Sequence, residues 1–434
     1  MKLQRIPFVL MIIVGVFMSA CTDTDDSTTT SKTTTITRFY LKNDSVTGLN
    51  KTVFTIDNDS NVIYNVDSLP YLSDVDSVIP SIYSAITLSA VYLNDTTLYT
   101  GKDTLDFTKP VKITTIATDK KTTRTYTVKV NVHQVDPDLY EWEGIKSEIY
   151  QGATVEQKAL LFSNTMHLFV KTTTEFKRYE SVDGKSWTAS TVTGLPLASS
   201  LKGIITTKDE MLLVYNQELY RSTNGSSWSK ITSPTVQLTR LLFSMNNKVY
   251  ALGTTDGSNR IMFESSDKTN WVNLGVAPEN FPVSGFSVWV DAAPSGKMQA
   301  FIVGGRSAQG TLLSSVWSTE NGSYWANLTA EKEWFTPREE AAVVQYGGGL
   351  MLIGGKNDNG TLTDTQWVSP DYGLSWKAAE EKAQLPDLYI PRFGQSIIVD
   401  KDNYIYLIGG QTSSTFLKDV WKGRKNSAIP GFLD

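Results

Sequence analysis

The sequence is poor in the residues that most metal sites and nucleophilic triads need. Its 434 residues include one cysteine and two histidines, His133 and His167. Zinc sites and Ser–His or Cys–His triads require such side chains to converge, and neither histidine lies in a cluster of possible ligands. We expect His167, within the apolar segment TMHLF, to be an inward or interfacial strand residue. The sequence predicts no metal site and no cofactor, and it assigns no catalytic residue.

An excess of positive charge is also absent. The 40 Lys and Arg residues are outnumbered by 45 Asp and Glu residues, so that the formal net charge is -5. Nucleic-acid binding depends on Lys and Arg side chains that neutralise phosphates. We therefore expect no nucleic-acid partner.

Long apolar runs are missing except for one short segment at the start, residues 6–17. It follows the positively charged start MKLQR, and the small residues Ser19 and Ala20 stand directly before Cys21. The run is too short for a comfortable transmembrane helix, and a polar tract follows it. The pattern resembles the lipobox of bacterial lipoproteins, which implies a signal peptide over residues 1–20 and a lipid anchor on Cys21. A plain signal peptide with an incidental cysteine is the alternative.

The segment after Cys21 has the composition of a flexible tether. Residues 21–35 are rich in Thr, Ser and Asp and carry no large apolar side chain, so they cannot offset the entropy of ordering. Asp23, Asp25 and Asp26 resemble the surface-export signals of Bacteroidota lipoproteins, although a solvated spacer would look the same. The resemblance implies an outer-membrane lipoprotein exposed at the cell surface, with the periplasmic face as the alternative.

Residues 36–135 have the pattern of a small β domain. Short alternating runs rich in Thr, Val, Ile and Tyr, such as 52–56 and 125–132, are separated by turn clusters, and no long helical period competes. An antiparallel sandwich satisfies this pattern. The stretch 105–111 and the strand that follows resemble the closing half of Ig-like domains.

After residue 136 the chain becomes repetitive. Five segments of the kind YESVDGKSW end in a tryptophan, and these tryptophans lie 41, 43, 54 and 51 residues apart, a spacing that suits one four-stranded blade per repeat. They are Trp187, Trp228, Trp271, Trp325 and Trp376. Three later strands end in glycine pairs, and another tryptophan follows each pair. We expect the Asp, Asn and Gly residues of the hairpin turns to serve the fold.

These motifs resemble known propeller families over residues 138–434. The glycine pairs are similar to kelch and galactose-oxidase-type propellers, and SPDYGLSW is similar to the Asp-box of sialidase-type propellers. Taken as a whole, the sequence resembles Bacteroidota lipoproteins of unknown function that have an Ig-like domain ahead of such a propeller. The implied fold class is all-β: an N-terminal Ig-like β-sandwich over 36–135, followed by a six-bladed kelch-like β-propeller over 136–434.

The last repeat lacks its outer strand, because Ile429 and Pro430 stand where the other repeats have their tryptophan. The segment 139–145 contains Trp142 and precedes the first complete repeat. An open ring would expose unpaired strand edges. We therefore predict that residues 139–145 pair with the strand near Val420 and close the ring.

Two arginines in matching places are the candidate ligand-binding residues. Arg338 and Arg392 stand 16 and 17 residues before the first glycine of their glycine pairs, whereas Arg240 is out of register. If they face the central channel, they would bind an anionic sugar, as the resemblance to kelch-type sialic acid mutarotases implies, with Glu339 or Glu340 beside them as acid or base. Alternatively, they hydrogen-bond neighbouring blades together, as kelch arginines often do.

Two enzyme families are disfavoured. The copper site of galactose oxidase needs two histidine ligands and a cysteine cross-linked to a tyrosine. Here the single cysteine is the expected lipidation site, and neither histidine lies in a cluster of possible ligands. The Arg-Ile-Pro sequence that opens sialidase propellers is also missing. We expect a non-enzymatic surface lipoprotein that binds a glycan or a protein partner. The alternative is a kelch-type enzyme acting on an acidic sugar, either mutarotase-like or a hydrolase. Carboxylates that converge on Arg338 and Arg392 would favour the enzyme.

Overall fold

The computed structural model describes residues 30–231, 234–254, 260–363 and 365–428. The expected signal peptide, the expected lipidation site Cys21 and most of the expected tether lie outside these residues. The described chain divides into two compact units between His133 and Gln134. Strands dominate both units, and the helical elements described are single 3-10 turns.

The N-terminal unit consists of two sheets. One pairs β1 with β4, and the other has the order β2-β3-β8-β7-β5-β6. The strands are β1 (Ile36–Lys42), β2 (Phe54–Asp57), β3 (Val62–Asn65), β4 (Ile79–Ser84), β5 (Ala90–Leu93), β6 (Thr97–Leu98), β7 (Val111–Ile116) and β8 (Thr123–Lys129), with the 3-10 turn η1 (Leu49–Lys51) after β1. All pairs are antiparallel except β3 with β8, which run parallel. A long connection between these two strands allows the parallel pairing, which the sequence pattern did not indicate.

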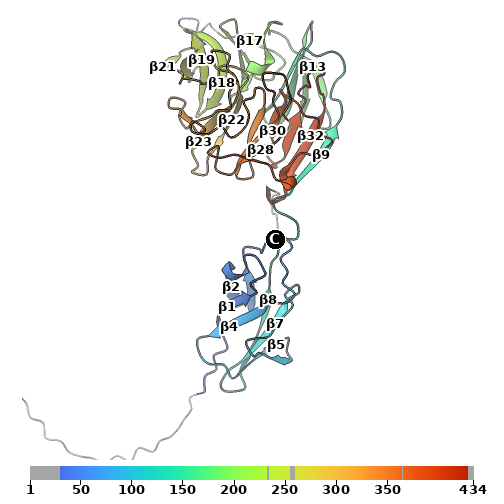
Figure 1. Ribbon diagram of the computed structural model, residues 1–434, viewed down its shortest axis with the longest axis vertical. Coiled ribbons are helices and arrows are strands. Elements are labelled where there is room, and N and C mark those ends of the chain that lie inside the picture. The colour runs from blue at the N-terminus through green and yellow to red at the C-terminus, as the bar shows by residue number, and fades with distance from the viewer. Residues whose placement is uncertain (1–29, 232–233, 255–259, 364, 429–434) are drawn as a thin grey trace, which may run out of the picture. The chain divides into compact units, whose positions relative to one another are not determined.

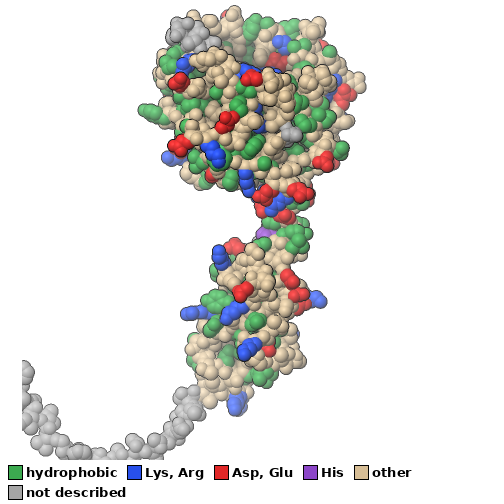
Figure 2. All heavy atoms as spheres, in the orientation of Figure 1, with side chains coloured by type: hydrophobic (Ala, Val, Ile, Leu, Met, Phe, Trp, Pro, Cys, Tyr) green, Lys and Arg blue, Asp and Glu red, His purple; other side chains and the backbone are tan. Residues whose placement is uncertain are grey.

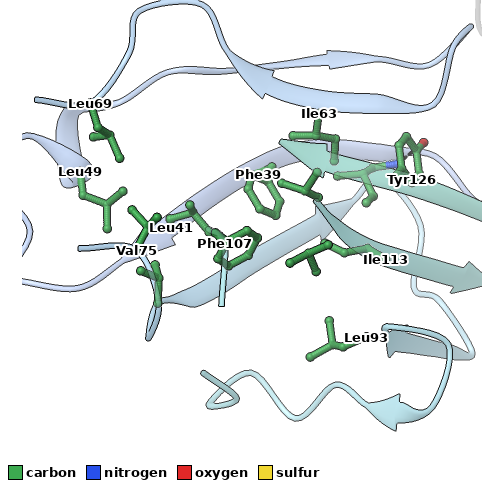
Figure 3. Packing of buried hydrophobic residues seen from close by; sticks show 14 of the residues in the cluster. Phe39, Leu41, Leu49, Ile63, Leu69, Val75, Leu93, Phe107, Ile113 and Tyr126 are labelled. Carbon is green, nitrogen blue, oxygen red and sulfur yellow. Dashed lines mark hydrogen bonds between the residues drawn. The ribbon is translucent and has the colours of Figure 1, made fainter. Parts of the chain in front are cut away.

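The two sheets enclose one apolar core. Phe39 and Leu41 of β1 pack with Ile113 of β7 and Tyr126 of β8 (Figure 3). Alternation makes this possible, because in β8 Tyr126 and Val128 are buried while the flanking threonines are not. The Tyr126 hydroxyl donates a 2.6 Å hydrogen bond to Asn58 Oδ1.

The N-terminal unit begins earlier than residue 36. The Ser31 backbone N–H donates to Thr118 Oγ1 at 2.8 Å, and the Thr115 hydroxyl donates to the Thr34 carbonyl at 2.8 Å. Ser31 and Thr34, which composition alone places in the tether, therefore belong to the sheet-bound part of the chain.

The described part of the C-terminal unit forms six four-stranded antiparallel sheets. Sheet 1 contains β10 (Glu156–Phe162), β11 (Thr165–Lys171), β12 (Phe176–Ser181) and β13 (Thr188–Thr191). Sheet 2 contains β14 (Ile205–Thr206), β15 (Met211–Tyr215), β16 (Glu218–Ser222) and β17 (Ser229–Lys230). Sheet 3 contains β18 (Gln237–Met245), β19 (Lys248–Thr254), β20 (Ile261–Ser265) and β21 (Val272–Val276).

The remaining three sheets follow the same order along the chain. Sheet 4 contains β22 (Ser287–Ala292), β23 (Met298–Val303), β24 (Val316–Thr319) and β25 (Ala326–Asn327). Sheet 5 contains β26 (Ala342–Tyr346), β27 (Gly349–Ile353), β28 (Trp367–Ser369) and β29 (Lys377–Ala378). Sheet 6 contains β30 (Ser396–Val399), β31 (Ile405–Ile408), β32 (Val420–Lys425) and β9 (Tyr140–Lys146). The 3-10 turns are η2 (Leu201–Gly203), η3 (Glu381–Ala383) and η4 (Asn426–Ala428).

The first strands of the six sheets form a closed ring. β10, β14, β18, β22, β26 and β30 each contact the next in this order, and β30 contacts β10. The first strand of every sheet therefore lines the axis, and the sheets radiate from it (Figure 1).

The predicted closure of the ring is confirmed. β9 pairs antiparallel with β32, with Trp142 opposite Gly423 and Gly144 opposite Trp421. In Figure 1 the blue-green β9 lies beside the red β32 at the edge of sheet 6. The outer strand of the last sheet thus comes from the start of the unit, and sheet 6 has no unpaired edge at this position.

The hairpin turns before the repeated tryptophans are held by their own polar side chains. In the first turn Ser181 Oγ accepts from the Gly184 N–H at 2.9 Å, and Asp183 Oδ1 accepts from two backbone N–H groups at 2.8 Å. The Trp187 indole donates to the Gly184 carbonyl at 2.9 Å. The same pattern recurs before Trp228, Trp271, Trp325 and Trp376. These residues are used for turn structure, as their pattern indicated.

Candidate functional site

The two candidate arginines are buried and bind the backbone. The Arg392 guanidinium donates to the carbonyls of Ile390 and Gly409 at 2.9 and 3.0 Å, and it forms a two-pronged ion pair with Asp419 at 2.6 and 3.0 Å. The Arg392 guanidinium also lies over the Tyr389 side chain, 4.2 Å from the centre of its aromatic ring. Every part of this contact set belongs to sheet 6 or to its connecting loops.

Arg338 repeats the arrangement in sheet 5. Its guanidinium donates to the carbonyls of Thr336 and Gly354 at 3.1 and 3.2 Å, and to Thr336 Oγ1 at 3.1 Å. Burial lowers the pKa of Arg338 to about 10. Both arginines therefore tie the loop before a first strand to the glycine pair after the second strand. This geometry matches the structural alternative and leaves little of either side chain for a ligand.

The loops that carry the two arginines pass close to the backbone of the glycine pairs. The Gly355 N–H donates to the Arg392 carbonyl at 3.0 Å, and a Cβ on Gly354 would lie 2.4 Å from the same carbonyl oxygen. Only glycine leaves room for this contact between sheets 5 and 6.

Glu339 and Glu340 do not converge on the arginines. Glu339 instead forms a two-pronged ion pair with Arg306 at 2.8 and 3.0 Å. Among the described residues, the carboxylate that reaches Arg392 is that of Asp419. The expected sign of an enzyme, carboxylates gathered around Arg338 and Arg392, is therefore not met in the described part of the chain.

Glu340 occupies a place that glycine holds in two other sheets. Its backbone has φ of 55°, in the left-handed region that is costly for most side chains. Gly285 precedes sheet 4 with φ of 63°, and Gly394 precedes sheet 6 with φ of 66°. The Glu340 N–H donates to the Gly285 carbonyl, and the Gly394 N–H donates to the Glu340 carbonyl. The repeat favours glycine here, so the glutamate is kept at a cost to the backbone.

The Glu340 side chain reaches across the mouth of the ring. Its Oε1 accepts from Lys202 Nζ at 2.5 Å. Lys202 precedes the first strand of sheet 2 and Glu340 precedes that of sheet 5, and these sheets lie opposite each other in the ring. The second oxygen, Oε2, is buried and has no hydrogen-bond partner among the described residues.

Two further cations lie inside the ring. Lys158 is the third residue of β10, two residues or about 7 Å beyond Glu156 on the same face of the strand. Burial lowers the pKa of Lys158, and the nearby charges of Lys202 and Arg240 lower it further. Burial likewise lowers the pKa of Arg240 in β18, whereas the negative charges of Glu340 and Glu156 raise it by a smaller amount. The Arg240 guanidinium lies 5.3 Å from the centre of the Phe286 ring.

A cleft of about 180 Å³ opens at this mouth, between sheets 6 and 1. Its walls include the charged side chains of Glu156, Lys202 and Glu340, and the loop residues Gln411 and Phe416. Glu156 Oε1 accepts from the Ser200 hydroxyl at 2.6 Å and from the Lys202 N–H at 3.1 Å, which fixes the loop that carries Lys202. The cleft thus combines a fixed rim, charges of both signs and one aromatic ring.

A larger cavity of about 300 Å³ lies at the opposite end of the ring, beside Tyr140 and Tyr346. Its charged side chains already pair with one another: Lys425 with Asp138 at 2.8 Å, and Lys377 with Glu380 at 2.6 Å. It offers no unsatisfied charge to a ligand, so the mouth is the better candidate site.

Sequence reasoning missed Lys158 and Lys202, and it set Arg240 aside. Arg240 differs from Arg338 and Arg392 because it lies within β18, opposite Leu252, after an irregularity in the pairing. The sequence signal for Lys158 was a charged residue within the apolar strand EQKALLF. Lysine is rarely buried in a core, so its position on a first strand indicates that it faces the channel. The opposition of Lys202 and Glu340 has no local signal, because 138 residues separate them.

Metal and membrane features are limited in the described residues. No group of three or more His, Cys, Asp or Glu side chains among them is placed to hold a metal ion. His167 is buried in β11, and burial lowers its pKa to about 4. No helix in residues 30–231, 234–254, 260–363 and 365–428 is long and apolar enough to cross a membrane. Acidic and basic side chains are interspersed over the face of the C-terminal unit seen in Figure 2.

Radiating antiparallel sheets whose inner strands close a ring define the C-terminal unit as a β-propeller. Comparison with family models agrees: residues 136–432 match the DUF6242 beta propeller domain, and residues 24–130 match the DUF6242 N-terminal domain, described as a domain of unknown function. The chain belongs to this family. No curated protein matches it.

Among solved structures, one described as the structure of YjhT is similar to this chain. The two sequences are 12% identical, the alignment covers 64% of this chain and 96% of that one, and the TM-score is 0.47.

Proposed function

We propose that this protein is an exported, lipid-anchored propeller protein that binds a glycan or a protein partner without converting it. The observation that carries the proposal is the cleft at the channel mouth. The side chains of Lys202 and Glu340 meet there across the ring, and the second Glu340 oxygen has no hydrogen-bond partner among the described residues. Backbone strain at Glu340 supports a role in binding, because strain of this kind persists mainly where function needs it.

The binding surface in this proposal is the rim beside the cleft. Phe416 offers an apolar ring, and no hydrogen bond joins the Gln411 side-chain amide to another described residue. Aromatic rings with nearby amides suit sugar rings, which present both C–H faces and hydroxyl groups. A glycan is therefore the preferred ligand, and a protein loop is the second possibility.

A glycan array on the chain from residue 30 onwards tests this binding. Phe416→Ala and Gln411→Ala should abolish or strongly weaken the signal of whichever glycan binds. Tyr324→Ala is the matched control, because Tyr324 is a highly exposed aromatic residue on the sheet 4 hairpin turn. Binding that survives both rim substitutions but is lost in the control would contradict the proposal. A pull-down with the same variants covers a protein partner.

The proposal includes the cellular location of the protein. The lipobox before Cys21 supports lipid anchoring in the outer membrane, and the acidic residues after it support exposure at the cell surface. Two or more acyl chains are what make membrane anchoring stable. Cys21→Ser should therefore release the protein from membranes, and protease treatment of whole cells should degrade the unsubstituted protein. A Cys21→Ser protein that fractionates wholly with membranes would contradict the anchor.

We propose that the six sheets are the blades of a six-bladed kelch-like propeller, supported by the ring order of their first strands. We propose that the N-terminal unit is an Ig-like sandwich, supported by its two sheets and single core. The parallel pairing of β3 with β8 is a departure from a purely antiparallel sandwich.

An enzyme acting on an acidic sugar is the second candidate function. The observation that favours it is the contact of an amine with a carboxylate at the channel mouth, Lys202 Nζ with Glu340 Oε1 at 2.5 Å. Such a pair has the composition of a general acid and base. Nuclear magnetic resonance of a sialic acid incubated with the protein tests it: accelerated exchange of the two anomers, lost in Glu340→Gln, would replace the binding proposal.

A further inference from the structure

The N-terminal unit has an open groove of about 660 Å³ beside the end of β1. Tyr40 and Lys42 of β1 line one part of it, and Ile79 of β4 and Thr104 line another. All of these residues belong to the same compact unit. The volume lies within the roughly 300–1,000 Å³ typical of small-ligand sites. The groove is therefore large enough to hold part of an oligosaccharide chain.

Side-chain hydrogen bonds fix the shape of this groove. The Asn43 amide donates to the Ser77 carbonyl at 3.0 Å, and Asn43 Oδ1 accepts from the Ser45 N–H at 2.9 Å. The Asn50 amide donates to Asp44 Oδ1 at 3.2 Å. These contacts join the loop after β1 to the segment before β4. Because the groove is formed in advance, a ligand has little ordering of the protein to offset.

The floor of the groove is apolar but closed. Leu41 and Leu49 line it, and they are only 2% and 1% exposed because they pack in the core of the unit (Figure 3). A peptide that docks in a groove inserts apolar side chains into open pockets. Here the core already fills the space around the two leucines. The groove therefore suits a polar ligand better than a peptide.

Two exposed tyrosines continue the groove along the outer face of the β1–β4 sheet. Tyr40 and Tyr83 are 46% and 50% exposed, and their rings meet edge to face with centroids 6.2 Å apart. Neither phenolic hydroxyl has a hydrogen-bond partner among the described residues. Aromatic faces suit the C–H faces of sugar rings, and phenolic hydroxyls can bond to sugar hydroxyls. The two rings thus provide a contact surface for a sugar chain.

The charges that line the groove balance each other. Lys42 supplies one positive charge and Asp44 one negative charge. The Lys42 ammonium has no hydrogen bond or ion pair with another described residue, and the same holds for the second Asp44 carboxylate oxygen. The groove therefore offers a free donor and a free acceptor without a net charge. Sugar hydroxyls, which both donate and accept, match this pair.

We propose that this groove binds a segment of a neutral oligosaccharide. A sugar ring packs on Tyr40, Lys42 donates to one sugar hydroxyl, and Asp44 accepts from another. Tyr83 contacts the next sugar along the chain. This inference goes beyond the proposed function, because it gives the N-terminal unit a binding site of its own. The tyrosines are half exposed, so the groove should bind more weakly than the channel mouth.

Isothermal titration calorimetry on the chain from residue 30 onwards tests the inference with three neutral probes: maltohexaose, cellohexaose and mannohexaose. At least one should bind, and Tyr40→Ala should weaken that binding at least about tenfold, whereas Phe416→Ala at the channel mouth should leave it unchanged. Binding that is lost in Phe416→Ala but kept in Tyr40→Ala would overturn the inference and support the channel-mouth function. If none of the probes binds, the inference falls, while the glycan array still decides on the channel mouth.

Further substitutions separate binding from folding. Tyr71→Ala is the matched control, because Tyr71 is a 42% exposed tyrosine of the same unit that does not line the groove. Tyr40→Phe keeps the ring and should keep most of the binding. Lys42→Met should weaken binding about tenfold with an unchanged melting temperature, as expected for a hydrogen bond from a charged donor. A structural role for Tyr40 alone predicts a lower melting temperature of Tyr40→Ala with unchanged binding, and that result would overturn the inference.

Discussion

Trp142 of β9 lies directly opposite Gly423 of β32, and its indole ring fills the space where a side chain on Gly423 would stand. A Cβ built on Gly423 would be 2.2 Å from Trp142 Cε3. Trp142 packs in the same apolar cluster as Trp421 and Tyr140. The contact joins the first strand of the C-terminal unit to its last strand, so it is the point at which the ring closes.

Gly423→Ala should therefore weaken the closure. The new methyl group overpacks against the indole, and we expect a loss of about 1–3 kcal/mol in the free energy of unfolding, measured by urea denaturation. Gly203→Ala is the control, because a Cβ there would meet nothing within 4 Å and the backbone φ is not positive. Equal stability of the two variants would contradict the contact.

Removing β9 altogether should have a larger effect. A chain that begins at Gln151 leaves β32 as an exposed edge and uncovers Trp421, whereas a chain that begins at Asp136 keeps the pairing. The shorter chain should be insoluble or melt at a clearly lower temperature. Identical melting temperatures would show that β9 contributes little to the ring, since both chains lack the N-terminal unit.

The architecture could be predicted to a useful extent because its repeat uses few residue types. The tryptophan spacing and the turn residues marked the sheets, and the surplus of Trp142 at one end against a missing strand at the other indicated the closure. The parallel β3–β8 pair could not be predicted, since both strands alternate in the same way whichever direction they pair. Ser31 and Thr34 also escaped, because their hydrogen bonds to the sheet use backbone groups that composition does not reveal.

The site was only partly predictable, for a physical reason. Spacing to the glycine pairs identified Arg338 and Arg392 as equivalent, but it could not tell whether their guanidinium groups bind backbone or ligand. The meeting of Lys202 with Glu340 depends on ring closure, which brings opposite sheets together over a separation of 138 residues. The strain at Glu340 emerges only when its φ is compared with those of Gly285 and Gly394.

Arg392→Ala should destabilise the propeller without changing ligand binding. The substitution leaves Asp419 without its guanidinium and opens the contact with the Gly409 carbonyl, and breaking a buried pair costs about 3–5 kcal/mol. Arg221→Ala, at an exposed arginine of β16, should change stability by less than about 0.5 kcal/mol. Weaker ligand binding at unchanged stability would instead make Arg392 a ligand-binding residue.

His167 should make stability depend on pH. Its pKa in the folded protein is lowered to about 4 by burial, below the ordinary value of 6.5, so the unfolded chain takes up a proton first as the pH falls. The free energy of unfolding should fall by up to about 3 kcal/mol between pH 6.5 and pH 4, and be insensitive to His167 above that window. His167→Gln should flatten the dependence. Urea unfolding at several pH values checks this, and identical slopes for both proteins would show that His167 does not titrate as described.

The most direct test of the account is a crystal structure of the chain from residue 30 onwards with the tightest ligand from the glycan array. The account predicts the ligand at the channel mouth, against Phe416, Lys202 and Glu340. The tryptophan hairpin turns lie at the opposite end of the sheets, because they connect the third strand to the fourth while the mouth precedes the first. A ligand bound at those turns, with an empty channel mouth, would contradict it.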